Sequence, residues 1–187
     1  AEAAGQLGIE ASSIEEFTRT MIDLGEATNL TSEQAATEFA RFANIVQMSQ
    51  EDFDRLGSSV VALGNTMATT EAEISSMAMR LAAQGSQVGM TEAQIMALAA
   101  TMSSLGIEAE AGGTAMTTVL KRIQTAVDEA GEDLEGFAKV ARVSSEECAK
   151  VWKDDPIEAL DMFIKGLAQS SEEGANLTTI LGELGIK

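Results

Sequence analysis

The sequence predicts an all-α protein, a multi-helix bundle of short capped helices, and two observations support this class. The first is the composition: 45% of the 187 residues are hydrophobic, but only 4% are aromatic, with no Tyr and 10 Met. A core of Ala, Leu, Ile and Met favours helices, because these residues have good or tolerable helix propensity and small side chains let helices approach closely. The second is a recurring helix-start signal, and no run of six or more residues alternates convincingly as a strand would.

Three glycines each lie six residues before a threonine that opens a Ser/Thr-x-x-Glu/Gln capping box. The pairs are Gly25 with Thr31, Gly64 with Thr70, and Gly85 with Thr91. In such a box the hydroxyl accepts a hydrogen bond from the third helical N–H, and the Glu or Gln accepts one from the N–H of the cap. We therefore expect each glycine to end a helix and each threonine to begin the next. The threonine spacings, 70 − 31 = 39 and 91 − 70 = 21 residues, predict a weak helical repeat with two unequal periods.

Similar signals begin other helices at Ser13, Ser49 and Ser144, and Asp155 stands directly before Pro156, which suits the first helical position. About ten helices are expected, at residues 13–24, 32–47, 50–67, 71–88, 92–105, 111–130, 133–141, 145–153, 156–170 and 175–184. The most regular is 111–130, whose apolar stripe makes it the expected central helix.

The run Gly131-Glu132-Asp133 interrupts the helical pattern after this helix. We expect it to divide the chain into an N-terminal helical bundle, residues 1–131, and a smaller C-terminal helical subdomain, residues 132–187. The first residues lack an initiator Met and the features of a signal peptide, which predicts a fragment of a longer protein.

The charge balance disfavours binding to nucleic acids and to anionic membrane surfaces. Lys and Arg number 12 against 30 Asp and Glu, a net charge of -18, and the only basic cluster is Lys121-Arg122. The longest stretches without charge, 56–70 and 93–107, are too short for a membrane span. A single cysteine, Cys148, cannot form an intrachain disulfide, which is compatible with assembly in the cytosol.

No catalytic, cofactor-binding or metal-ligating residue is predicted, and the chain is not expected to be an enzyme. The absence of His removes the imidazole base and the commonest metal ligand. The densest acidic group, Asp128-Glu129 with Glu132-Asp133, does not have the spacing of an EF-hand and is expected to be a solvated helix end. The run at 111–114, Ala-Gly-Gly-Thr, lacks the lysine and the preceding strand of a phosphate-binding loop, so we expect a flexible helix start.

The remaining conspicuous side chains are expected to be structural. Acidic neighbours, Glu146 and Glu147, disfavour a thiolate at Cys148, which is expected to be a buried thiol. Trp152 and Phe163 are expected to anchor the core of the C-terminal subdomain. The methionines are expected to fill the core, with an adaptable groove for a partner as the alternative.

The order of several motifs resembles bacteriophage tail tape measure proteins. The segment at 105–116, LGIEAEAGGTAM, is similar to the part of that family in which an Ala-Gly-Thr helix start follows a Leu-Gly helix stop. The downstream order also agrees: FAKVA at 137–141, the cap Ser144, DDPIEAL at 154–160, and LGI at 184–186. The likeness extends from Leu7 to Lys187; each motif is weak alone, and their order together is fairly specific.

The resemblance implies a structural phage or prophage tail protein that occupies the tail tube lumen and sets tail length. The partners it implies are the tail tube, the tail assembly chaperone and baseplate proteins, together with other copies of itself. It implies the host cytoplasm during assembly and the virion tail afterwards. Frequent glycines and caps indicate that this region is not the ruler shaft, which needs an unbroken heptad or 11-residue pattern. The alternatives are a non-phage helical adaptor with an Ala/Met groove for a partner helix, and a carboxylate-based hydrolase.

Two positions depart from the family pattern. Arg142-Val143 stands where the family usually has Gly-Met, and Cys148 replaces a usual Phe. We therefore expect the loop after Ala141 not to adopt a glycine conformation, and the C-terminal subdomain to pack differently.

Overall fold

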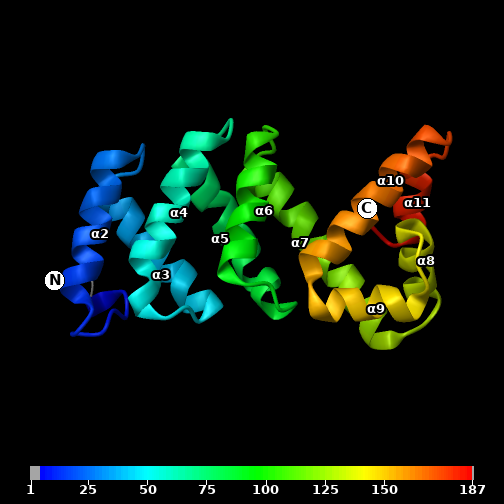
Figure 1. Cartoon of the computed structure of the whole chain (residues 1–187), viewed down its shortest axis with the longest axis horizontal. Helices are drawn as coiled ribbons and strands as arrows, with labels where there is room; N and C mark the ends of the chain where they lie inside the picture. The colour runs from blue at the N-terminus through cyan, green and yellow to red at the C-terminus, as the bar shows by residue number, and fades with distance from the viewer. Residues whose placement is uncertain (1–4, 187) are drawn as a thin grey trace. The chain divides into compact units, whose positions relative to one another are not determined.

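The predicted all-α class is confirmed by a computed structural model of the chain, which describes residues 5–186 (Figure 1). The stretch Ala1 to Ala4, used above to argue against a signal peptide, lies outside them. From Ile14 onward the described chain forms ten α-helices and one 3-10 helix, and residues 5–186 contain no strand. Their bounds are α2 Ile14–Ala27, α3 Ser32–Val46, η1 Gln50–Asp52, α4 Phe53–Thr66, α5 Glu71–Gln87, α6 Glu92–Ser104, α7 Ala109–Glu129, α8 Glu132–Ala141, α9 Ser145–Asp154, α10 Pro156–Glu172 and α11 Leu177–Glu183.

The chain divides into two compact units, which we describe separately. The first comprises Ala1–Ser86 and Thr91–Thr114, and the second comprises Gln87–Met90 and Ala115–Lys187, so α7 contributes residues to both. The boundary expected between residues 131 and 132 stays a prediction, because compactness does not test which part folds alone.

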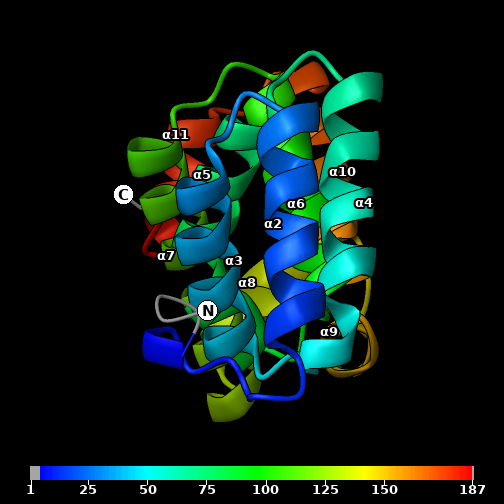
Figure 2. The same ribbon diagram turned by 90° about the vertical axis from the view of Figure 1, so that its left-hand side faces the viewer.

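The first unit is a stack of helical hairpins in two layers. Helices α2, α4 and α6 lie side by side in one layer, and α3 and α5 lie in the other (Figures 1 and 2). The front helices begin at residues 14, 53 and 92, and the back helices at 32 and 71, so every interval within a layer is 39 residues. The period is therefore uniform, and the spacing of 21 residues joins the back helix of one hairpin to the front helix of the next.

The repeat also appears in the buried core. Phe17, Leu56 and Ile95 are 39 residues apart and are all buried. Met21, Val60 and Ala99 form a second buried series with the same spacing. Each fully buried large apolar side chain contributes roughly 1.5–3 kcal/mol, so the shared positions hold the hairpins together.

The repeated glycines do not end helices, and that expectation was wrong. Gly25 and Gly64 lie within α2 and α4, close to their C-terminal ends, and α2 continues to Ala27 rather than stopping at residue 24. A Cβ at Gly25 would lie 2.8 Å from the backbone nitrogen of Ser32, and one at Gly64 would lie 2.6 Å from the carboxyl carbon of Glu71. Ser32 and Glu71 are the first residues of the next helices, so these glycines allow the tight approach within each hairpin. The third glycine, Gly85, likewise lies inside α5.

The predicted capping boxes are confirmed. At Thr91 the hydroxyl accepts from the N–H of Gln94 at 3.2 Å, and Oε1 of Gln94 accepts from the N–H of Thr91 at 2.9 Å. Reciprocal pairs also join Thr31 with Gln34 and Thr70 with Glu73.

The serine caps agree with the structure only in part. Ser144 and Asp155 cap α9 and α10, and Pro156 begins α10, as predicted. Ser13 differs, because its backbone is right-handed helical and its side chain makes no capping bond to α2. The hydroxyl of Ser49 caps the 3-10 helix η1, which precedes α4.

In the second unit α8, α9 and α10 pack against one another, and α11 packs on α10. The rings of Phe137 and Phe163 lie 5.3 Å apart and join α8 to α10. The same helices approach most closely at Gly166, where a Cβ would lie 2.7 Å from the carbonyl carbon of Val140 and would also overlap its oxygen. Only a residue without a side chain allows this crossing.

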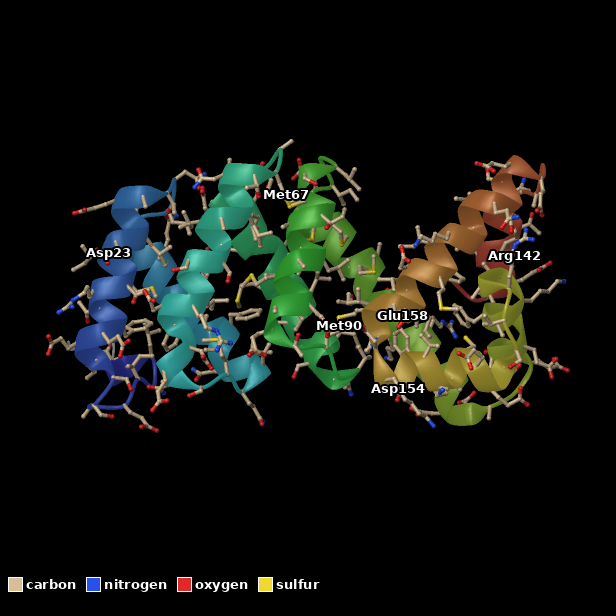
Figure 3. The ribbon with its side chains drawn as sticks, in the orientation of Figure 1. Asp23, Met67, Met90, Arg142, Asp154 and Glu158 are labelled. Atoms are coloured by element: carbon tan, nitrogen blue, oxygen red, sulfur yellow. The ribbon has the colours of Figure 1, made fainter. Side chains whose placement is uncertain are left out.

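The loop after α8 does adopt a glycine conformation, which corrects the expectation for Arg142. This residue has φ 61° and ψ 38°, in the left-handed region. The following N–H, of Val143, bonds back to the carbonyl of Ala138 at 3.0 Å and closes the helix end. The guanidinium of Arg142 is paired with the carboxylate of Glu173 at 2.7 Å, at the C-terminal end of α10 (Figure 3). Different packing of the C-terminal subdomain stays a prediction.

Candidate functional surfaces

The acidic residues between α7 and α8 form a solvated connection. Asp128, Glu129, Glu132 and Asp133 are all exposed, and Asp128 accepts a hydrogen bond from the amide of Gln124 at 2.8 Å. Across residues 5–186 no group of three or more Asp, Glu, Cys or His residues is arranged to hold a metal ion. These carboxylates therefore contribute charge at a helix junction.

The glycine run at 111–114 has a packing role. It lies inside α7, which begins at Ala109, so the expected flexible helix start was wrong. Gly112 and Gly113 are buried, and a Cβ at Gly113 would lie 2.5 Å from Cβ of Arg80 on α5. The two glycines let α7 approach its neighbours, and neither stands at a helix N-terminus where a phosphate would bind.

Cys148 and Trp152 lie on the buried face of α9, as predicted. Burial removes solvent from the thiol and raises the pKa of Cys148 above its usual value, which disfavours the reactive thiolate. Trp152 is 1% exposed, and its indole N–H donates to Oε1 of Gln124 on α7 at 2.9 Å. Phe163 is also buried, so both aromatic side chains anchor the core of the second unit.

The methionines mainly fill the core, but two of them also border a groove between α4 and α6. Met21, Met77 and Met96 are at most 3% exposed. The groove, of about 400 Å³, has Met48 and Met96 in its walls and small residues such as Ala62 and Ala97 along its floor. The sequence signal for it is the alanine-rich outer face of α6, which composition alone assigns equally well to helix packing.

A second hollow, of about 440 Å³, lies in the second unit among α8, α10 and α11. Its border carries two basic residues, Lys139 and Arg142, and two acidic residues, Glu173 and Glu183. Because these charges balance, the hollow has no preference for an anion or a cation.

None of the helices described between residues 5 and 186 is both long and apolar enough to cross a membrane. The fold thus defines a helical hairpin-repeat protein with apolar grooves and a strongly acidic surface. The family of phage-related minor tail proteins matches residues 1–184, and the chain belongs to this family. No curated protein and no solved structure matches the chain. As a member it is a structural component of a phage tail.

Proposed function

We propose that the chain is part of a tape measure protein, which occupies the tail tube lumen and sets tail length. The observation that carries this proposal is the match to the minor tail family over residues 1–184. The proposed partners are the tail tube, the tail assembly chaperone and baseplate proteins, met first in the host cytoplasm and then in the virion.

The charge of the chain supports a place inside a tube that DNA must later pass. A net charge of -18 repels the phosphate backbone and disfavours adhesion to it.

Within that protein, the hairpin repeat is an assembly region and not the ruler. A continuous helix of 39 residues would extend ~58 Å, at about 1.5 Å per residue. In the first unit the same 39 residues fold back as two antiparallel helices, and neighbouring helices pack roughly 8–10 Å apart. Each repeat therefore adds little length for its number of residues, which is a poor use of chain for a ruler.

Deletion of residues 1–187 from the parent protein, followed by electron microscopy of the tails, tests this assignment. A docking or assembly region is needed before tails form, so we expect few or no tails. Abundant tails shorter by ~280 Å, which is 187 residues at about 1.5 Å each, would make the region part of the ruler. Abundant tails of normal length would remove it from tail building.

The groove between α4 and α6 favours a second candidate function, a helical adaptor that binds a partner helix. Ala97→Trp would fill the groove, whereas Thr101→Trp, one turn further along the exposed side of α6, is the matched control. If the groove holds a partner helix, only the first substitution reduces tail yield in a phage carrying it. Equal yields from both variants would reject the adaptor role.

A further inference from the structure

Helix α2 exposes a face that its equivalents in the repeat bury. Ile22 is 47% exposed, whereas Ala100, two repeats later, is 0% exposed. Thr18 is half-buried, but its equivalents Gly57 and Met96 are both buried. The same surface of the hairpin is thus covered twice within the chain and uncovered once.

The cover in the later repeats is the preceding helix of the front layer. A Cβ at Gly57 of α4 would lie 3.3 Å from side-chain atoms of both Thr20 and Leu24 on α2. On α2 itself, the corresponding surface is an open hollow of about 600 Å³. We call this surface the α2 end face; it is lined by Ala11, Ile14, Glu15, Thr18, Arg19 and Ile22.

We propose that the α2 end face pairs with the same face of a second copy of this chain. Ile14, Thr18 and Ile22 are spaced by four residues and form one ridge along the helix. If two such ridges pack antiparallel about a two-fold axis at Thr18, Ile14 meets the partner's Ile22, and each copy supplies the helix that the other lacks. A two-fold interface requires a self-complementary surface, and this ridge has one.

The charges of the α2 end face also favour a second copy. Glu15 and Arg19 form an ion pair within the helix at 3.4 Å, with side chains 90% and 73% exposed. In the antiparallel arrangement each Arg19 lies near the partner's Glu15, so attraction replaces repulsion. The stripe is neutral in a chain of net charge -18, so the repulsion between two copies is smallest there. A strongly basic partner would instead prefer the acidic surfaces elsewhere.

Sedimentation equilibrium of the full chain between about 5 and 500 µM tests the pairing. One helix pair buries less than the roughly 800 Å² per partner of a standard interface, so we expect a dimer with a dissociation constant of about 10–100 µM. Ile22→Glu should weaken association at least tenfold. Ile164→Glu is the matched control, because Ile164 is 49% exposed on α10 and lies outside the α2 end face, and it should leave association unchanged.

A charge exchange tests the orientation. Glu15→Arg and Arg19→Glu should each weaken the dimer, and the double variant should restore it, because the cross-pairs then form with reversed signs. Thr18→Cys should give a disulfide-linked dimer on mild oxidation, whereas the parent, with only the buried Cys148, should not. A monomer at 500 µM, equal effects of the two glutamate variants, or failure of the double exchange would overturn the proposal.

Discussion

The crossing of α8 and α10 at Gly166 gives the sharpest test of the packing. Gly166→Ala adds one methyl group, and the added Cβ would meet the carbonyl group and the following Cα of the α8 backbone, the latter at 3.3 Å. A flexible side chain could rotate away, but a helix backbone cannot, so the helices must separate. Overpacking of this kind costs about 1–3 kcal/mol, and the greater helix propensity of Ala offsets about 1 kcal/mol of it.

Gly182 in α11 is the matched control. A Cβ there would meet nothing within 4 Å, and Gly182 is exposed. The same substitution should therefore raise the free energy of unfolding, by up to about 1 kcal/mol, through helix propensity alone.

Urea unfolding followed by circular dichroism measures both variants, with the slope against urea compared to exclude changes in the unfolded state. We expect a lower midpoint for Gly166→Ala and a higher midpoint for Gly182→Ala. If Gly166→Ala were as stable as the parent, the close crossing of α8 and α10 would be refuted.

Three further predictions concern helix ends. Thr91→Ala should lower the free energy of unfolding by about 0.5–2 kcal/mol through loss of the cap of α6, whereas Thr101→Ala, which removes only a bond to the carbonyl one turn earlier, should change it by less than about 0.5 kcal/mol in the same urea titration. Arg142→Gly should be more stable than Arg142→Ala by about 0.5–1 kcal/mol, because both lose the ion pair but only glycine relieves the left-handed backbone; equal midpoints would contradict this. The hydrogen bonds from Thr70 lower the pKa of Glu73 below 4.5, so its ionised form stabilises the fold above that pH and the stabilisation is lost as the pH falls through the lowered pKa. Glu73→Gln keeps a neutral box, so the melting temperatures of parent and variant should converge between pH 5 and about 3, and a constant difference would contradict the assignment.

Helix positions could be predicted from the sequence because capping is local. The hydroxyl of Thr31 or Thr91 and its Gln partner lie within one helical turn, so their spacing along the chain determines the geometry. All ten expected helices correspond to helices of the structure, and α3 and α6 begin at the predicted residues.

The functions of the glycines could not be predicted in the same way, because they depend on neighbouring helices. Whether Gly64 ends a helix or admits Glu71 is decided by where α5 lies, and the same sequence pattern allows both. The uniform repeat was hidden for a related reason: Asp52 precedes α4 at the position that Thr91 holds before α6, but it makes no side-chain capping bond.

The candidate surfaces depend still more on tertiary structure. The groove between α4 and α6 requires the distance between two helices, and the α2 end face is recognised only when exposure is compared across repeats. At Arg142 the residue type indicated a non-glycine loop, but the left-handed backbone occurs together with the pairing to Glu173, 31 residues further along the chain. Sequence spacing contains no information about that contact.

Duplication of one repeat in the parent protein tests the central claim, that this region is a folded part of a tape measure and not its ruler. A second copy of residues 53–91 inserted after residue 91 adds one hairpin of 39 residues in register with the stack. Tail lengths are then measured by electron microscopy in a phage that carries the duplication. Our account predicts tails within roughly 10 Å of the normal length, the width of one packed helix. Tails longer by ~58 Å, the length of 39 residues of continuous helix, would contradict it.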